Sequence, residues 1–389
     1  MPRSVMTIYG TRPEAIKMAP LVRALSADPD IEARVVVTGQ HRAMLDQVNT
    51  LFEITPAHDL NIITPRQTLA EITERALRGL TEVIRADRPE LVVVQGDTTT
   101  SFVAALAAFY ESVPVVHLEA GLRTDNPRAP FPEEINRRLT SHIASLHLAP
   151  TATARSNLLR EGIAADSIAV TGNTVIDALQ AAVRLNVAYS DAALSRAGRQ
   201  RTVLITCHRR ESWGAPMAGI ARAVRTLAST FPDSLFVLPA HLNPVVREVL
   251  LPPLAGLENV IVTEPLSYGE FSRLMNDSHL IVTDSGGVQE EGPSLGKPVL
   301  VMRETTERPE AVTQGAVRLV GSDEGRIVAE VSALLRDDAA YRRMASAVNP
   351  YGDGHAAGRS VHAIRHFLDL EAKPAPDFQP TTSGVADPA

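Results

Sequence analysis

The sequence has 389 residues, of which 44% are hydrophobic and 21% charged, and its formal net charge is −7. A chain of this length accommodates two domains, each with its own core. The negative balance and the lack of a strongly basic segment argue against a nucleic-acid-binding surface. The one cysteine, Cys207, excludes an intrachain disulfide and a cysteine-built zinc site.

The N-terminal residues, "MPRSVMTIYG", enter a strand-like run at once and lack the pattern of a signal peptide. The longest apolar stretches, such as "FVAALAAFY", are too short to span a bilayer. We therefore expect a cytoplasmic protein that makes no membrane contact.

Apolar runs alternate with helical patterns from the N-terminus onward. The expected strands of the first half are "SVMTIYG", "EARVVVTG", "ELVVVQGD", "VPVVHLEAG", "LHLAP" and "SIAVTGN". Segments such as "EAIKMAPLVRALSA" and "TSFVAALAAFYE" lie between them and are predicted helices. The pattern restarts with "TVLITCH", "LFVLPAH", "NVIVTEP", "HLIVTDSGG", "PVLVMRE" and "AVRLVG". Continuous apolar strands separated by helices indicate parallel sheets that are covered on both faces.

We therefore predict an α/β protein with two doubly wound, Rossmann-like domains and a ligand cleft at the carboxyl ends of the strands. The predicted boundaries are an N-terminal domain over 1–175, a helical linker over 176–200 and a C-terminal domain over 201–360. A C-terminal helix over 361–372 is expected to pack back toward the N-terminal domain. Residues 373–389 are rich in Pro, Ser and Thr and are predicted to be a disordered tail.

Functional residues of such folds lie on the loops after the strands. In "GTRPEAIK", Arg12 and Lys17 flank a helix N-terminus and suit a phosphate, although a solvated helix face explains them equally well. Asp97 in "QGDTTTS" follows a strand and is either a helix cap or a functional carboxylate. Glu119 ends a wholly apolar strand, which makes a surface role less natural.

In "PFPEEINRRLT", Glu133 and Arg137 have i, i+4 spacing, which supports an exposed helix or holds and tunes a carboxylate. His208 and His241 follow successive strands of the second half. No G-x-G-x-x-G follows any strand, which argues against a standard dinucleotide site, and no Cys/His cluster suggests a metal.

The segment "VTDSGGVQEEGPSLGKPV" combines an anion-binding loop with two carboxylates. Backbone N–H groups near Ser285, Gly286 and Gly287 suit phosphate oxygens. Glu291, one helical turn further on, suits ribose hydroxyls, as an acidic residue does in dinucleotide folds. The segment therefore predicts nucleotide recognition.

Together, "GTRPEAIKMAPL", "GDTTT", "EAGLRT", "PEEINRR", "HRRES", "HLNP", "TDSGGVQEEGPSLGKPVLVMR" and "TTERPEAV" resemble the signatures of the non-hydrolysing UDP-N-acetylglucosamine 2-epimerase family. The resemblance implies the GT-B architecture, with a UDP-binding C-terminal domain and the active site in the cleft between the domains. It further implies interconversion of UDP-GlcNAc and UDP-ManNAc without a metal or redox cofactor, a homodimer, and supply of ManNAc units to a cell-surface polysaccharide.

The resemblance also assigns roles to individual residues. Catalysis would fall to Asp97, Glu119, Glu133 and His208. Substrate binding would fall to Arg12, Lys17, Arg137, His241, Leu266, Phe271, Ser285, Gly286, Gly287, Glu291 and Arg308. A regulatory site for a second UDP-GlcNAc would include Gln40, His41 and Arg66.

The chemistry restricts the mechanism, because C2 of the sugar is not adjacent to a carbonyl and its proton is not acidic. Departure of UDP from C1 would make this proton removable and leave a bound 2-acetamidoglucal. The alternatives are a hydrolysing epimerase, a GT-B glycosyltransferase and a non-catalytic UDP-sugar sensor. Three carboxylates would weaken binding of an anionic ligand, which disfavours the sensor.

Overall fold

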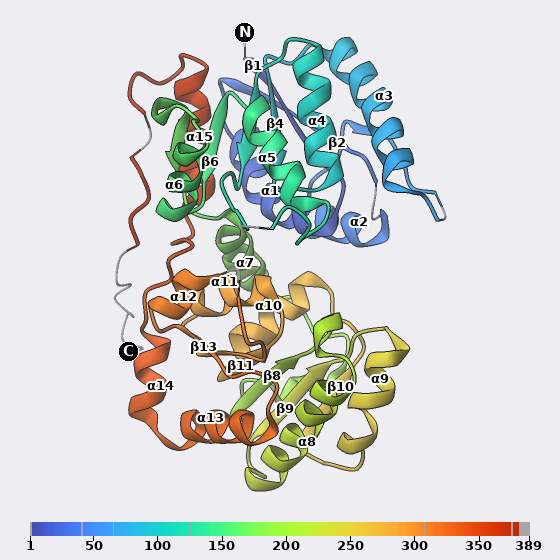
Figure 1. The fold of residues 1–389 in the computed structure, drawn as a ribbon, viewed down its shortest axis with the longest axis vertical. Helices are drawn as coiled ribbons and strands as arrows, with labels where there is room; N and C mark the ends of the chain where they lie inside the picture. The colour runs from blue at the N-terminus through green and yellow to red at the C-terminus, as the bar shows by residue number, and fades with distance from the viewer. Residues whose placement is uncertain are drawn as a thin grey trace. The chain divides into compact units, whose positions relative to one another are not determined.

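The computed structural model describes residues 2–39, 42–64, 66–124, 126–306, 308–374 and 376–380. The chain divides into two compact units (Figure 1). Unit 1 is Met1–Ala178 together with Tyr351–Gln379, and Leu179–Pro350 form most of unit 2. Each unit is built around its own parallel β-sheet, which confirms the predicted fold class of two α/β domains in tandem, consistent with the GT-B architecture.

The sheet of unit 1 has seven parallel strands in the order β3-β2-β1-β4-β5-β6-β7. They are β1 (Arg3–Tyr9), β2 (Ile31–Val37), β3 (His58–Asp59), β4 (Leu91–Gln95), β5 (Val115–Leu118), β6 (Leu146–Ala149) and β7 (Ile168–Val170). The central strands are buried and rich in valine and isoleucine, as expected for a sheet with both faces covered. The two-residue edge strand β3 has no apolar run and was not predicted.

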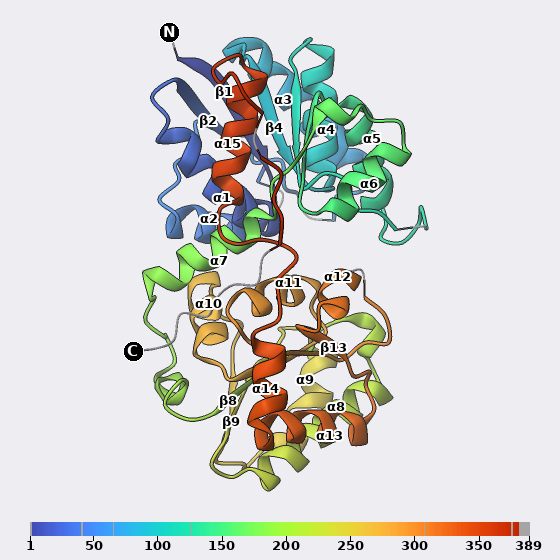
Figure 2. The same cartoon turned by 90° about the vertical axis from the view of Figure 1, so that its left-hand side faces the viewer.

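The helices of unit 1 cover both faces of this sheet, as Figure 2 shows. They are α1 (Arg12–Ser26), α2 (Arg42–Leu51), α3 (Leu69–Asp87), α4 (Thr99–Tyr110), α5 (Glu133–Ile143), α6 (Ala152–Arg160), η1 (Ala165–Ser167) and α15 (Ala356–Phe367). Helix α7 (Thr174–Leu185) begins in unit 1 and ends in unit 2. Helix α4 packs against α3 and α5, and α1 packs against α2 and α15. A core of strand residues such as Ile8 and Val92 and helix residues such as Leu80 and Val103 lies under α3 and α4.

The sheet of unit 2 has six parallel strands in the order β10-β9-β8-β11-β12-β13. They are β8 (Thr202–Thr206), β9 (Leu235–Pro239), β10 (Val260–Thr263), β11 (Leu280–Thr283), β12 (Val299–Val301) and β13 (Val317–Leu319). All six coincide with the apolar runs of the sequence.

The helices of unit 2 include one pair that packs closely, α8 and α13, with α9 beside α8. The helical elements are η2 (Ala192–Arg196), η3 (Arg210–Ser212), α8 (Ala215–Thr230), α9 (Pro244–Leu250), η4 (Pro252–Leu254), α10 (Tyr268–Asp277), α11 (Gly286–Ser294), α12 (Pro309–Thr313), α13 (Glu324–Arg336) and α14 (Asp338–Ala345). The apolar faces of α8 and α13 bury residues such as Ile220 and Val331 against Phe236 and Val282 of the sheet.

Both sheets reverse their strand order at one place, between β1 and β4 in unit 1 and between β8 and β11 in unit 2. The chain leaves such a pair of strands toward opposite sides, so their carboxyl ends open a crevice in which open α/β sheets bind ligands. The loops after β1 and β4 therefore locate a candidate site region in unit 1, and those after β8 and β11 locate one in unit 2.

The C-terminal segment returns to unit 1. Helix α15 packs on α1, and Arg365 pairs with Asp28 through both carboxylate oxygens at 2.8 Å. Further on, the Phe378 N–H donates to the Val170 carbonyl at 2.7 Å, and the phenyl ring is buried. The segment that returns to unit 1 thus starts at residue 351, before the predicted returning helix. Its contacts continue past residue 373, where a disordered tail was expected. Residues 381–389 of that tail lie outside the described residues.

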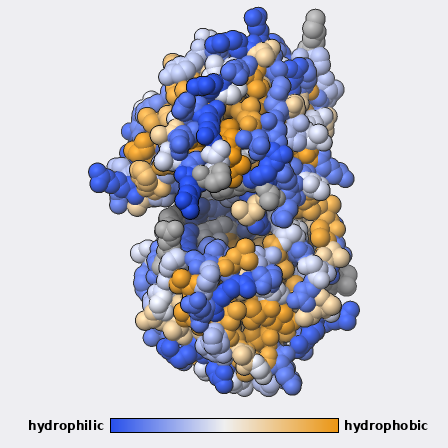
Figure 3. Space-filling model, turned by 90° about the vertical axis from the view of Figure 1, so that its right-hand side faces the viewer, coloured by the Kyte–Doolittle hydropathy of each residue, from blue (hydrophilic) through white to orange (hydrophobic). Residues whose placement is uncertain are grey.

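No described helix has the length and apolar character needed to cross a membrane. No group of three or more His, Cys, Asp or Glu side chains within the described ranges is arranged to hold a metal ion. The face seen in Figure 3 mixes hydrophilic and hydrophobic residues in both units.

Candidate active site

In unit 1, a buried carboxylate joins the two loops at the strand-order reversal. Glu14 of α1 accepts hydrogen bonds from the Gly10 and Thr11 N–H groups at 3.1 and 2.8 Å and from the Thr98 hydroxyl at 2.6 Å. A Cβ atom on Gly10 would overlap the Thr38 hydroxyl, so this turn requires glycine. Burial raises the pKa of Glu14, and the hydrogen bonds oppose that shift. The hydrogen bonds of the Glu14 carboxylate therefore hold the loop after β1 against the loop after β4.

Glu119 follows β5 and has a left-handed backbone, with φ of 63°. This conformation is uncommon for a residue with a side chain and is found where the surroundings impose it. Lys17 Nζ lies 2.5 Å from its Oε1, and Asn173 donates to the same oxygen at 3.1 Å. Gln95 donates to Oε2 at 2.5 Å. Both carboxylate oxygens are therefore held by donors from three other elements.

Asp97 lies in the loop after β4 and is paired with Arg137 of α5, whose Nη2 is 2.5 Å from Asp97 Oδ2. Burial raises the pKa of Asp97; the Arg137 charge opposes this shift and the neighbouring Glu119 charge adds to it. The two carboxylates, Asp97 and Glu119, thus lie close to the cations Lys17 and Arg137. We call these four residues the carboxylate set. A carboxyl group with a raised pKa is better suited to proton transfer near neutral pH than an ordinary aspartate.

The structure pairs Arg137 with Asp97 and not with Glu133, and the catalytic role of Glu133 stays a prediction. Within the described part of the chain Glu133 makes no ion pair or hydrogen bond, and its side chain is half-buried. The next residue, Glu134, is fully buried and binds Arg138 Nε at 2.8 Å, the Thr124 N–H at 3.0 Å and, more distantly, Arg137. The direction of the α5 side chains explains the difference, because α5 turns Glu134 inward.

In unit 2, His208 and His241 end neighbouring strands β8 and β9, and their rings stack with centroids 5.9 Å apart. His208 Nδ1 lies 3.1 Å from Oδ1 of Asp284, the residue that follows β11. Burial lowers the pKa of His241, and the charge of His208 adds to that shift. The preceding Cys207 is buried, which raises the pKa of its thiol, so it is no nucleophile.

The N-terminus of α11 is built for an anion. Its first turn holds no acidic residue, and its N-cap, Ser285, makes no side-chain cap, so the first N–H groups of the helix have no partner from the cap. A Cβ atom on Gly286 would lie 3.3 Å from Arg209 Nη2, which places the guanidinium against this turn. We call His208, Arg209 and the α11 N-terminus the anion-binding end of unit 2.

The two carboxylates of "VQEEG" do not oppose this anion site. Glu290 is paired with Arg308 at 2.5 Å, and Glu291 accepts a hydrogen bond from the Tyr268 hydroxyl at 3.3 Å. Both side chains are buried in the later turns of α11. Arg308, predicted to bind substrate, therefore already neutralises Glu290. Leu266 and Phe271 are half-buried, before and within α10.

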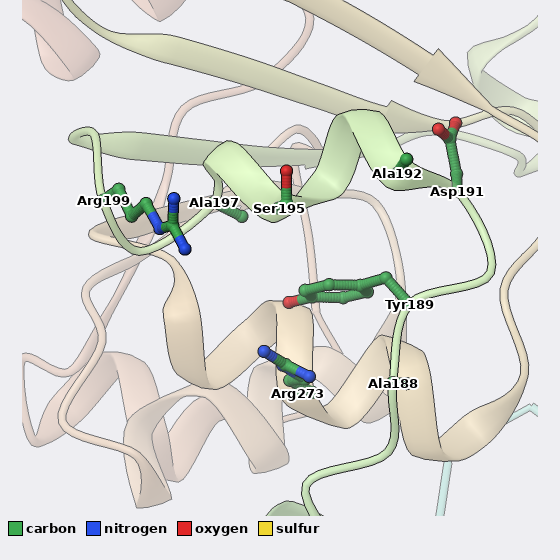
Figure 4. A pocket seen from close by; sticks show the side chains of 8 residues that line it. All are labelled: Ala188, Tyr189, Asp191, Ala192, Ser195, Ala197, Arg199 and Arg273. Carbon is green, nitrogen blue, oxygen red and sulfur yellow. The ribbon is translucent and has the colours of Figure 1, made fainter.

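A separate recess lies elsewhere in unit 2, beside α10 and η2 (Figure 4). It has a volume of about 270 Å³ and is lined by Tyr189, Arg199 and Arg273 among others. Arg273 stacks on the Tyr189 ring and both side chains bond to Asp277. None of the predicted site residues lines this recess.

Comparison with known proteins agrees with the geometry. The family model for UDP-N-acetylglucosamine 2-epimerase matches residues 23–365. The chain belongs to the UDP-N-acetylglucosamine 2-epimerase family. The family member from Escherichia coli O157:H7 is 54% identical over 370 residues, which cover 93% of this chain and 98% of that one. The member from Bacillus subtilis is 52% identical over 360 residues, covering 92% and 94%.

A solved structure of the family shows the same fold. The UDP-GlcNAc 2-epimerase from Neisseria meningitidis, bound to UDP-GlcNAc, is 46% identical and superposes with a TM-score of 0.84. The match covers 94% of this chain and 100% of that one.

Of the three residues that the family resemblance assigns to regulation, only Arg66 lies within the described residues. Gln40 and His41 lie outside the described residues. Arg66 lies between β3 and α3, is exposed and has a left-handed backbone with φ of 60°. Its role in regulation stays a prediction.

Several residues that hold the site were missed. Gln95 and Asn173 bind Glu119; Gln95 opens the segment "QGDTTTS", of which only Asp97 was considered, and Asn173 ends a predicted strand. Glu14 could have been found, because Thr11-Arg12-Pro13-Glu14 has the spacing of a capping box. Asp284 also had a signal, since it is an acidic residue placed directly after an apolar strand.

Proposed function

We propose that this protein interconverts UDP-N-acetylglucosamine and UDP-N-acetylmannosamine by inverting C2, and that it is a non-hydrolysing epimerase. The observation that carries the proposal is the carboxylate set, because inversion at C2 needs groups that remove and return a proton. The identity to epimerases over nearly the whole chain supports the same substrate.

In this proposal, UDP leaves first. The C1–O bond breaks with its electron pair going to the diphosphate, and the C2 proton is removed, so that a C1=C2 double bond forms in 2-acetamidoglucal. A proton then adds to the opposite face of C2, and the diphosphate oxygen re-forms its bond to C1. The anion-binding end of unit 2 stabilises the charge that develops on UDP, through the α11 N–H groups, Arg209 and His208.

The contacts suggest different roles for Asp97 and Glu119. Glu119 has both oxygens occupied by Lys17, Asn173 and Gln95. Oδ2 of Asp97 binds Arg137, and Oδ1 has no side-chain partner among the described residues. Its raised pKa further favours proton exchange. We therefore assign a direct proton transfer to Asp97, with Glu119 as the second group, on the other face.

Product analysis tests this function. Purified protein is incubated with UDP-GlcNAc alone, and proton NMR follows the anomeric signals. We expect UDP-ManNAc in equilibrium with UDP-GlcNAc. Accumulation of free ManNAc and UDP would instead show a hydrolysing epimerase, and turnover only after addition of a sugar acceptor would show a glycosyltransferase.

Three expectations from the family resemblance stay proposals: a homodimer, supply of ManNAc units for a cell-surface polysaccharide, and activation by a second UDP-GlcNAc. Sedimentation velocity tests the first. Sigmoidal dependence of the rate on UDP-GlcNAc, lost in Arg66→Ala, tests the third.

A further inference from the structure

Asp284 joins the two loops at the strand-order reversal of unit 2. It follows β11, and its carboxylate is fully buried. Its Oδ2 accepts the N–H groups of His208 and Arg209 at 2.8 and 2.9 Å, from the loop after the neighbouring strand β8. Its Oδ1 lies 3.1 Å from the His208 ring nitrogen Nδ1. One carboxylate therefore accepts the backbone N–H of His208 through Oδ2 and places its other oxygen beside the His208 ring nitrogen Nδ1.

A negative charge at this place needs an explanation, because the neighbouring helix N-terminus is built for an anion. Burial alone would raise the pKa of Asp284, but the hydrogen bond and charge of His208 and the two backbone N–H groups outweigh it and lower the pKa. Asp284 is thus an anion beside an anion site. A neutral acceptor would hold the backbone of the loop equally well without repelling a diphosphate.

The ring of His208 gives the explanation. With Nδ1 facing a carboxylate, which only accepts hydrogen bonds, the proton of the neutral ring stays on Nδ1. Any proton that the ring gains or loses is then exchanged at Nε2, on the edge away from Asp284. The side chain of His208 as a whole is 41% exposed.

We propose that Asp284 is a positioning residue for the epimerase reaction. It fixes the tautomer and orientation of His208, so that Nε2 exchanges a proton with the phosphate oxygen that leaves C1 and returns to it. The inference rests on the proposed function, because it assigns the partner of His208 as the diphosphate of a nucleotide sugar. It is separate from the carboxylate set, which acts at C2.

Asp284→Asn distinguishes tautomer control from a purely structural role. The backbone N–H groups of His208 and Arg209 need an acceptor, so the amide oxygen takes the place of Oδ2. The amide NH₂ then faces Nδ1, which must become an acceptor, and the proton of the neutral ring moves to Nε2. The loop stays in place while the ring carries its proton on the other nitrogen.

The test is NMR of the full chain labelled with ¹⁵N-histidine, with the His208 signals assigned by their loss in His208→Ala. We expect the Nδ1–H form in the unchanged protein and the Nε2–H form in Asp284→Asn. We also expect kcat to fall roughly 100-fold or more, with little change in KM, as when a buried carboxylate that orients a catalytic histidine is replaced. In a His208→Ala background, Asp284→Asn should have little further effect on kcat.

Asp177→Asn is the matched control, because Asp177 is also a buried carboxylate that accepts two backbone N–H groups, those of Ala356 and Ala357. It should lower the thermal midpoint without changing the His208 spectrum. An Nε2–H form in the unchanged protein overturns the proposal whether or not Asp284→Asn folds. An equal loss of kcat with and without His208 also overturns it. If the spectra behave as expected but no epimerisation occurs, tautomer control stands and the proposed function fails.

Discussion

Arg137 and Asp97 lie 2.5 Å apart, although 40 residues separate them in the chain. Helix α5 carries the guanidinium and the loop after β4 carries the carboxylate. The pair keeps Asp97 in place while burial raises its pKa. A carboxyl group that is fixed in position and ready to exchange a proton is the central element of the account.

Asp97→Asn should lower kcat roughly 1,000-fold with little change in KM, because an amide keeps the size of the side chain but cannot take up a proton. Steady-state kinetics with UDP-GlcNAc measure this. Glu161→Gln is the control: it removes a carboxylate of unit 1 that is paired with Arg123, away from the carboxylate set. Full activity of Asp97→Asn would exclude Asp97 from proton transfer.

The same substitution should stabilise the fold near neutral pH. The pKa of Asp97 is raised in the folded state above its ordinary 3.8, so between these two values the folded state binds more protons than the unfolded state. Stability therefore falls as pH rises through this range, and the loss persists above the folded pKa. Urea unfolding should show Asp97→Asn more stable than the unchanged protein near neutral pH. The difference should shrink as the pH approaches 3.8; a constant difference at all pH values would contradict this.

The acid limb of the pH–rate profile should lie at a higher pH than an ordinary aspartate would give, because the pKa of Asp97 is raised. If Asp97 must be ionised to remove the C2 proton, kcat/KM falls as pH drops through its raised pKa, at a pH above 3.8. Rates across an acidic pH series measure the limb. An acid limb at or below the ordinary pKa of aspartate would contradict a catalytic role for the buried Asp97.

Gly286→Ala should weaken UDP binding by roughly tenfold, because the new Cβ atom displaces a guanidinium that contributes a charged hydrogen bond. Its Cβ would lie 3.3 Å from Arg209 Nη2. Calorimetric titration with UDP measures the affinity. Gly358→Ala, in α15 with nothing within 4 Å of the new atom, is the control and should leave UDP affinity unchanged. Equal affinity of both variants would show that UDP does not use this turn.

The sequence predicted the sheets well because buried parallel strands need continuous apolar residues. Each run that was expected to be a strand is one. The same apolar runs located the loops that follow the strands, and Asp97, Glu119 and His208 were singled out as polar residues of those loops. It could not distinguish Glu133 from Glu134, because each has an arginine four residues later, and only the packing of α5 shows which side chain points inward. Gln95 and Asn173 were missed because their role depends on contacts across the fold.

The C-terminal segment shows a second limit of sequence-based prediction. Its proline-rich composition suggested disorder, yet the buried Phe378 ring packs against Arg359 and its backbone bonds to the edge strand β7. A single aromatic side chain with a place to pack outweighs the average composition of its segment.

Arg365→Ala should lower the free energy of unfolding of unit 1 by about 1 kcal/mol, because it removes the ion pairs of Arg365 with Asp28 and Asp30, which join α15 to the segment after α1. The pair with Asp28 is largely shielded, with side-chain exposures of 22% for Arg365 and 11% for Asp28. Arg78→Ala removes an exposed pair with Glu74, at 72% and 68%, and should have a smaller effect. Urea unfolding compares the two, and equal effects would mean that α15 is held by apolar packing alone.

The most direct test of the account is the fate of the proton at C2. The protein is incubated with UDP-GlcNAc in D₂O without added cofactor, and proton NMR follows the C2 signal. The account predicts deuterium at C2 in both UDP-GlcNAc and UDP-ManNAc, because the carboxyl groups exchange their protons with solvent between removal and return. Conversion to UDP-ManNAc with the original proton kept at C2 would contradict proton transfer by the carboxylate set.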